Sequence, residues 1–418
     1  SRFGSRLCAC LIMKSLAEMK ANPILGGVPD DHFDRFIEDD LEIFQIEPQF
    51  KEKLRWMDTF VREEVEPLDE LDFSPYDTAH PLRKVLFPPL QQKVREQGLW
   101  ACHLDPQLGG PGYGQLKLAL MNIILGRSKC ASKIFGTAAP DTGNTEILAH
   151  FGSPEQRERY LEPLLADEIS SCWSMTEPQA GADPKQFRLT AMQDPATGDW
   201  VLNGEKIWSS NAKFAAFFLV CAVTDPHAKN RYKGQSIFIV DAKNPGLKIL
   251  RNLGVGFAEF AEFDDRPGMS GGSHGHVQYH NCRVSADSIL GKPGDGFLVQ
   301  QTRLSGGRIH YGMRAVGQCQ KALKMILVRV HSRETQGEVL AAKQLVQQMI
   351  AECWMDIEQL KLLVLRTAWK IDKYQDYTKV RKDISACKIL CSKVQAEVAR
   401  KAIQLHGGLG ASWDLPFG

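Results

Sequence analysis

The sequence predicts an α+β protein in which a sheet-rich segment lies between two helical segments. Apolar residues recur at helical spacing before residue 169 and after residue 290, whereas short strand-like runs separated by turns fill the interval. Strands and helices do not alternate along the chain, which argues against a doubly wound parallel sheet. We expect an N-terminal tail over 1–46, a helical domain over 47–168, a β-barrel domain over 169–290 and a helical bundle over 291–418.

The amino-acid composition argues against two classes of protein, non-specific nucleic-acid binders and membrane-spanning proteins. The 418 residues include 51 Lys and Arg against 50 Asp and Glu, so the chain lacks the broad basic field of a non-specific nucleic-acid binder. No apolar run approaches the ~18 residues of a membrane span. The eleven cysteines show no paired or zinc-type spacing, which predicts buried free thiols.

The N-terminal tail has two interpretations. It contains Arg and Ser and has no acidic residue before Glu18, which is typical of the remnant of a mitochondrial presequence. A disordered or artificial tail is the alternative. We therefore expect an intracellular protein, with a mitochondrial location favoured over a peroxisomal or cytosolic one.

The first helical segment begins near Glu47. Leu54, Met57, Val61 and Val65 lie on one helical face, and Pro67 is expected to end that helix. A second helix is expected to end near Gly98. The Gly-rich stretch 108–114 follows no strand and lacks the dinucleotide spacing, so it is interpreted as a loop before helices resume over 116–165.

The middle segment shows strand periodicity. Phe187, Leu189 and Ala191 alternate, residues 194–199 form a turn pattern, and the pair Asn203–Gly204 indicates a hairpin. Residues 217–223 and 236–240 are further strand candidates. A loop is expected over 264–276, and its histidines, with one just beyond it, are interpreted as solvated rather than as metal ligands: His274, His276 and His280.

The last segment contains two long amphipathic helices. The first carries one apolar face over 346–364, and the second is expected over 380–405. With the sheet between two helical domains, a ligand is expected to bind between domains.

Two sequence segments suit a flat heteroaromatic ligand. Residues 172–183 and 204–211 each place a tryptophan beside hydroxyl residues at the edge of an expected strand. An indole wall with short donors can stack a ring and hydrogen-bond its polar rim. Burial of both tryptophans in a hydrophobic core is the alternative.

Four motifs, in order, resemble those of the acyl-CoA dehydrogenase family. They are Met-Thr-Glu-Pro with Gly and Asp at 175–183, Gly-Glu-Lys-Ile-Trp-Ser-Ser at 204–210, Arg-Glu-Thr-Gln-Gly at 333–337 with a following Gln, and Gln-Leu-His-Gly-Gly-Leu-Gly at 404–410. The segments 307–314 and 408–416 look like the branch that contains family members ten and eleven. The chain departs from the usual pattern at Gln336, where Phe is common, and at Ala182, where Ser is common.

This resemblance implies a three-domain fold with bound FAD and an acyl-CoA substrate. It assigns flavin-ring contacts to the middle domain, namely Trp173, Met175, Thr176, Trp208 and Ser210, and places Gly181 and Ala182 near the flavin phosphates and the CoA arm. Five late residues would meet the FAD of a neighbouring subunit or its diphosphate: Arg333, Gln344, Gln404, Gly407 and Gly408. Arg308 would act close to the substrate, with a structural salt bridge as the alternative, and a homodimer or homotetramer is implied.

The resemblance does not identify a catalytic base. The usual carboxylate follows the Gly-Gly motif by about two dozen residues, beyond Gly418, and the alternative position in the motif is Gly307, which has no side chain. The C-terminal bundle is therefore expected to be truncated, and Asp414 lies too near the motif to be assigned. We expect an acyl-CoA dehydrogenase acting on medium to long or modified chains, with electron-transfer flavoprotein as acceptor. The alternative is a catalytically impaired protein that binds acyl-CoA and FAD.

Overall fold

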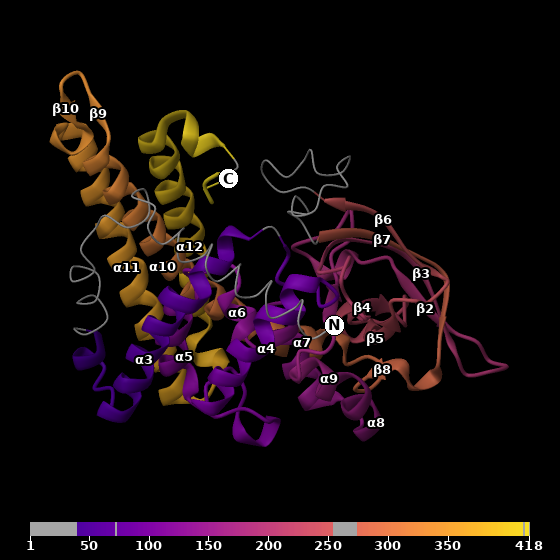
Figure 1. Ribbon diagram of the computed structural model, residues 1–418. Coiled ribbons are helices and arrows are strands. Elements are labelled where there is room, and N and C mark those ends of the chain that lie inside the picture. The colour runs from indigo at the N-terminus through magenta and orange to yellow at the C-terminus, as the bar shows by residue number, and fades with distance from the viewer. Residues whose placement is uncertain (1–39, 72, 254–273, 413, 418) are drawn as a thin grey trace, which may run out of the picture.

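A computed structural model describes residues 40–71, 73–253, 274–412 and 414–417 of the chain (Figure 1). The described residues form helices, then a sheet, then helices, in the predicted order. Of the tail predicted over 1–46, residues 1–39 lie outside the described residues, as does most of the loop expected over 264–276. The described end of that tail is not free of the fold as predicted, because Leu41 and Ile46 are buried in the core of the helical domains. His274 and His276 are described, and they lie within a strand rather than in that loop.

The N-terminal domain is built from short helices. Its helices are α3 (Pro48–Phe60), α4 (Pro81–Glu96), α5 (Gly114–Leu125), α6 (Ala131–Ile134), α7 (Asp141–Phe151), α8 (Pro154–Gln156) and α9 (Glu162–Leu165). The predicted apolar face is confirmed, because Leu54 and Met57 are buried. Pro67 does not end the first helix as predicted. The chain passes from α3 through a π turn over Val61–Val65 into a 3₁₀ turn over Glu66–Glu70. Pro67 lies in the first turn of that 3₁₀ segment, where a missing N–H breaks no bond.

The middle domain is one mixed sheet. Its strands are β1 (Ser171–Ser174), β2 (Thr190–Gln193), β3 (Trp200–Ser210), β4 (Phe217–Val223), β5 (Gln235–Asp241), β6 (Leu247–Leu253), β7 (His274–Val284) and β8 (Ile289–Leu290). The order is β6-β7-β3-β1-β4-β5-β8, and β2 also pairs with β3 and β4. Since β1 and β2 pair with different parts of the same two strands, they lie end to end between β3 and β4.

The hairpin predicted at Asn203–Gly204 is wrong. Both residues lie inside β3, where the register against β7 shifts between Leu202 and Gly204. A Cβ on Gly204 would lie 2.8 Å from the Cα of Leu189, and the φ of Gly204 is 143°. Glycine is therefore needed at this position because the backbone of Leu189 approaches the bulged strand closely. Apart from turns, such close approaches are a common reason for Gly in strands.

The C-terminal domain is a helical bundle. It contains α10 (Gly296–Ser332), the small hairpin of β9 (Glu334–Thr335) and β10 (Glu338–Val339), α11 (Gln344–Tyr374) and α12 (Tyr377–His406), followed by a 3₁₀ turn over Gly407–Ala411. The face predicted on the first long helix is confirmed, because Cys353, Ile357 and Leu360 are buried. The helix expected over 380–405 is α12.

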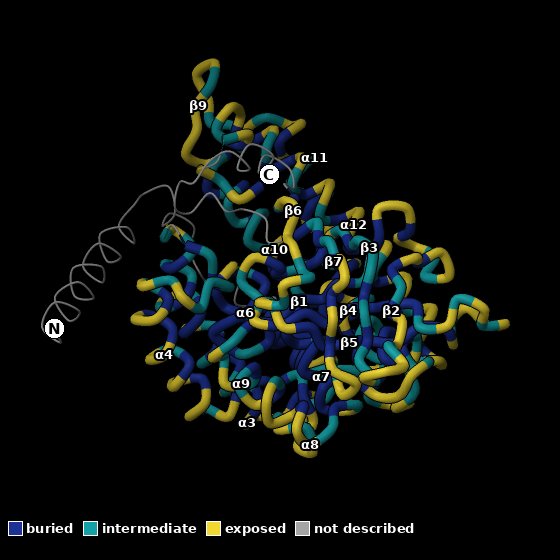
Figure 2. Tube along the Cα trace, turned by 90° about the vertical axis from the view of Figure 1, so that its right-hand side faces the viewer, coloured by how far each residue is buried: buried dark blue, intermediate teal, exposed yellow. Residues whose placement is uncertain are grey.

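The hydrophobic core joins the two helical domains. One cluster of buried side chains includes residues of α3, α5, α10, α11 and α12, whereas the sheet has two separate clusters on its two faces. Figure 2 shows the buried centre at β1, β4 and β5, and all seven residues of β4 are buried. The nine cysteines among the described residues are free and buried, as predicted. No helix within the described ranges has the length and apolar character needed to span a membrane.

Candidate active site

A strained bulge in β3 exposes the side chain of Trp208. The register between β3 and β7 shifts between Lys206 and Ser209, which leaves an extra residue on β3. Trp208 has a φ of 59° and is 48% exposed, both unusual for a large aromatic residue in a strand. Bulges redirect side chains next to active sites, so the exposed indole indicates a ligand-facing position.

The segment that follows β1 lies against this bulge. The backbone N–H of Ile207 donates to the carbonyl of Thr176 at 2.8 Å. Within the described part of the chain, neither the N–H nor the hydroxyl of Thr176 donates a hydrogen bond. Met175 and Thr176 are half-buried, and Gly181 and Ala182 farther along are exposed. The predicted residues of this segment therefore gather beside Trp208 with donors left over for a ligand.

A buried ion pair holds the segment in place. The ammonium of Lys206 donates to the Met175 carbonyl and to Oε1 of Glu177, each at 2.8 Å. Glu177 also accepts from the backbone N–H groups of Arg188 and Leu189. Burial alone would raise the pKa of Glu177, but Lys206 and these hydrogen bonds keep that pKa below its usual value. Lys206 lies within a motif used for the family resemblance, yet the sequence did not reveal this role.

Trp173 lies on β1, opposite Ser210 of β3, and is buried. The guanidinium carbon of Arg303 on α10 lies 4.3 Å from the centre of its indole ring. Sequence reasoning missed Arg303 and assigned the nearby Arg308 instead. Five residues on a helix turn the direction by about 140°, so Arg308 faces elsewhere. The only sequence signal for Arg303 is that it lies three and four residues, about one helical turn, before Gly306 and Gly307. The substrate role of Arg308 stays a prediction.

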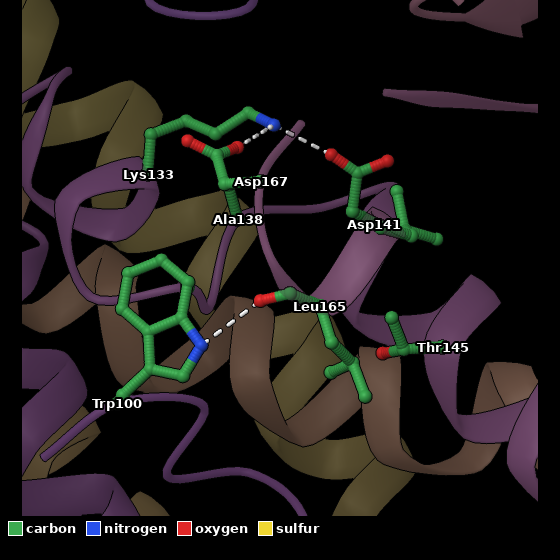
Figure 3. Close-up of a pocket in the computed structure, with 9 residues that line it drawn as sticks. Trp100, Lys133, Ala138, Asp141, Thr145, Leu165 and Asp167 are labelled. Atoms are coloured by element: carbon green, nitrogen blue, oxygen red, sulfur yellow. Dashed lines mark hydrogen bonds and ion pairs between the residues drawn. The ribbon is translucent and has the colours of Figure 1, made fainter. Parts of the chain in front are cut away.

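An ion-pair network contacts the start of β1, and Figure 3 shows its Lys133, Asp141 and Asp167 side chains. Lys133 bridges Asp141 at 2.6 Å and Asp167 at 3.3 Å, and Asp167 also pairs with Arg83. Asp141 in turn accepts from the N–H and the hydroxyl of Ser171. The adjoining cavity of about 20 Å³ has room for roughly one water molecule, so this network is structural and is not a substrate site.

Glu146 on α7 is a carboxyl without a hydrogen-bond partner among the described residues. Its Oε2 lies 3.5 Å from the point that a Cβ on Gly306 of α10 would occupy. Burial raises the pKa of Glu146 to about 7, with Arg303 opposing and Asp105 adding to the rise. This carboxyl thus changes charge near neutral pH, between the N-terminal domain and the bundle.

Replacing Glu146 by glutamine is expected to stabilise the protein at alkaline pH. The raised pKa means that ionisation destabilises the folded state as pH rises from about 4.5 to about 7, and the penalty is complete above that range. The free energy of unfolding of E146Q, relative to that of the wild type, should therefore rise by about 1–2 kcal/mol from pH 5 to pH 8. This is less than the full linkage value, because the Glu146 side chain is only partly buried. Denaturant unfolding at both pH values measures this gain. The exposed Glu158→Gln variant is the control, and a difference that does not change with pH would contradict the prediction.

The remaining predicted cofactor residues lie at one end of the bundle. Arg329 of α10 donates to the carbonyl of His406, so the ends of α10 and α12 are adjacent. All five predicted residues at this end are exposed: Arg333, Gln344, Gln404, Gly407 and Gly408. In Figure 1 the β9–β10 hairpin, between Arg333 and Gln344, projects from the bundle on the side away from the sheet. Within one chain, the structure therefore does not bring Arg333 and Gln344 to Trp208.

Comparison with known proteins identifies the class. The N-terminal, middle and C-terminal domain models of acyl-CoA dehydrogenase match residues 49–168, 172–281 and 294–418. A structure of an acyl-CoA dehydrogenase from Mycobacterium abscessus is 32% identical with a TM-score of 0.78, and the match covers 89% of this chain and 91% of that one. The three domains and the site at the bulge of β3 thus define a flavoprotein oxidoreductase.

Relatives among known sequences agree with this class. "Probable acyl-CoA dehydrogenase FadE2" of Mycobacterium tuberculosis is 36% identical, over 83% of this chain and 83% of that protein. "Acyl-CoA dehydrogenase family member 11" of Gallus gallus is 34% identical over 90% of this chain. The match spans only 48% of that relative's length. The chain belongs to the acyl-CoA dehydrogenase family.

FAD is the cofactor of this class, and the residues present fit it. Trp208 offers an exposed ring, and Thr176 offers two unused donors beside it. At the end of the bundle, a Cβ on Gly407 or Gly408 would meet no atom within 4 Å, so the backbone there is open to a phosphate group. Gly407 has a φ of 66°, which favours glycine at that position.

Proposed function

We propose that the protein catalyses FAD-dependent α,β-dehydrogenation of acyl-CoA thioesters of medium to long or modified chain. Family membership supports the reaction class. A relative named (R)-benzylsuccinyl-CoA dehydrogenase, from Thauera aromatica, is 34% identical over 78% of this chain, which favours modified chains. We further propose electron-transfer flavoprotein as the acceptor. A structure titled for an electron transferring flavoprotein of Acidaminococcus fermentans matches at 25% identity and a TM-score of 0.69.

The bulge at Trp208 beside Thr176 is the observation that carries this proposal. Bound FAD would accept the hydride from Cβ of the thioester. Trp208 would cover the ring, and the N–H and hydroxyl of Thr176 would hydrogen-bond its polar edge. Trp173 and Met175 would bound the ring from β1 and the segment after it. These groups position the ring, whereas removal of the α-proton needs a carboxylate base.

Visible absorbance of the flavin tests the proposal directly. The purified full-length protein, loaded with FAD, is mixed anaerobically with acyl-CoAs of graded chain length and with hydroxylated or carboxylated analogues. Loss of flavin absorbance with at least one of them is expected. An absence of bleaching with every substrate would contradict dehydrogenation.

An impaired acyl-CoA-binding protein is the second candidate. No carboxylate occupies the family's alternative base position, Gly307, which supports this candidate. It predicts tight acyl-CoA binding by calorimetry with unchanged flavin absorbance. Turnover faster than that of free FAD would reject it.

We also propose that the protein works as a homo-oligomer in which a second copy completes the FAD site. The bundle-end residues lie apart from the sheet site, and α11 exposes Met355, Leu362 and Trp369 at seven-residue spacing. Light scattering should show a dimer or tetramer, and Leu362→Glu should weaken both assembly and FAD retention. A monomer that holds FAD fully would contradict this arrangement. A mitochondrial location is proposed from the N-terminal composition alone, and fractionation of cells tests it.

A further inference from the structure

Arg303 is held against Trp173 by a specific anchor. Its Nε donates to Oδ1 of Asn144 on α7 at 2.8 Å, while the guanidinium lies over the Trp173 ring. A Cβ on Gly143 would lie 2.9 Å from Cγ of Arg303, so the glycine makes room for the arginine. The arginine therefore occupies a fitted position between α7 and α10.

The anchor is itself fixed by buried hydrogen bonds. The side-chain amide of Asn144 donates to Oγ of Ser171 at 2.8 Å, and that hydroxyl donates to Asp141 at 2.6 Å. Asn144 and Ser171 have no exposed surface. Ser171 begins β1, and Trp173 follows two residues later. One chain of hydrogen bonds therefore fixes the positions of both the Arg303 guanidinium and the Trp173 indole.

Arg303 forms no direct ion pair with a described residue. In the ranges that the structure describes, no carboxylate lies within ion-pair distance of it, and Glu146 and Asp141 act on it only through space. Burial lowers the pKa of Arg303 to about 10, which still leaves a cation at neutral pH. Only one of its five N–H donors has a partner here. A partly buried cation without a counter-ion is unfavourable, and an arriving anion relieves that cost.

We propose that Arg303 is a positioning residue of the flavin site, which fixes the Trp173 indole and places a permanent positive charge where negative charge on the reduced cofactor is stabilised. The inference rests on the proposed function, because it assumes that the ring lies beside Trp173. A fixed cation next to a redox group favours its reduced, more negative form. The charge should therefore make the bound flavin easier to reduce.

The reduction potential of bound FAD, measured without substrate, tests the inference. Xanthine and xanthine oxidase supply the electrons, and a reference dye reports the two-electron equilibrium. Arg303→Gln removes the charge and should shift that equilibrium about tenfold toward oxidised flavin, which corresponds to about 30 mV. Arg303→Lys keeps the charge, so its equilibrium should lie within about twofold of the wild type. The matched control is Arg366→Gln, which removes an exposed arginine paired with Asp383 on the bundle surface.

A second readout follows the indole and needs no cofactor. Near-ultraviolet circular dichroism of the FAD-free protein, compared with that of Trp173→Phe, isolates the Trp173 signal. Both Arg303 variants and Asn144→Ala should reduce this signal, because each removes the planar guanidinium or its anchor. If Arg303→Gln does not fold, the other two variants still test the inference.

The outcomes separate this inference from the proposed function. Wild-type protein that retains no FAD overturns both. If the wild type retains FAD but the reduction potential of FAD bound to Arg303→Gln equals that of the wild type, only the role of Arg303 is overturned. A tenfold shift in Arg303→Lys would also overturn it, because the charge would then not be the cause.

Discussion

Replacing Lys206 by methionine should destabilise the protein by about 3–5 kcal/mol, because it leaves the buried Glu177 carboxylate without its cation. Lys206 and Glu177 are 0% and 3% exposed. The ammonium also satisfies the carbonyl of Met175, which loses its donor in the variant. Denaturant unfolding measures the loss. FAD retention should fall as well, since Met175 leads into the Thr176 segment.

A double variant provides the control for this prediction. Glu177→Gln in the Lys206→Met background removes the unpaired charge and keeps one acceptor oxygen, so one of the two N–H groups of Arg188 and Leu189 still has its partner. The double variant should therefore be more stable than Lys206→Met alone. The Lys206→Met penalty should also shrink as pH falls, because protonation of Glu177 removes the buried charge. A loss below about 1 kcal/mol, or one that grows at acid pH, would contradict the buried-pair argument.

Replacing Gly317 by alanine should cost about 3 kcal/mol or more. A Cβ on Gly317 of α10 would lie 1.9 Å from the carbonyl oxygen of Ile123 in α5, and a Cβ on Gly126 would lie 2.2 Å from the carbonyl oxygen of Arg314. The two helices thus touch through their backbones. Because backbone cannot rotate away as a side chain can, the helices must separate and open the core that joins the N-terminal domain to the bundle. Thermal and denaturant unfolding measure the effect.

Gly312→Ala is the matched control on the same helix. Gly312 is also buried, but a Cβ there would be 3.4 Å from Val364 and 3.8 Å from Cys387, near ordinary contact. Alanine has the higher helix propensity, so this variant should differ from the wild type by at most ~1 kcal/mol. Equal effects of the two substitutions would show that helix propensity, and not the crossing of α5 and α10, sets the result.

Local pattern predicted most elements correctly. The strands predicted at 217–223 and 236–240 are β4 and β5, and the two long amphipathic patterns are α11 and α12. These predictions depend on periodic burial, which a single segment records by itself. Asn203–Gly204 and Pro67 were misjudged because each residue type serves two purposes. For Gly204 the purpose is set by Leu189, which comes from another segment of the chain.

The candidate site was predicted only in part. The motifs located Trp208 and Thr176, and the structure brings them together, although the bulge that exposes Trp208 has no signature in the sequence. Arg303 was missed because its importance comes from lying over Trp173, 130 residues earlier in the chain. Arg308 was chosen in its place because sequence proximity to a motif does not state which way a helical side chain points.

The sequence by itself determined the succession of helical and sheet segments, the free thiols and the resemblance to the family, since these depend on local periodicity and short motifs. Only the tertiary structure decided which buried charges have an ion-pair partner and which do not. Lys206 has Glu177, whereas Arg303 and Glu146 have no ion-pair partner in the described ranges. The reason is physical, because the energy of a buried charge depends on atoms a few ångströms away, which come from segments distant in sequence.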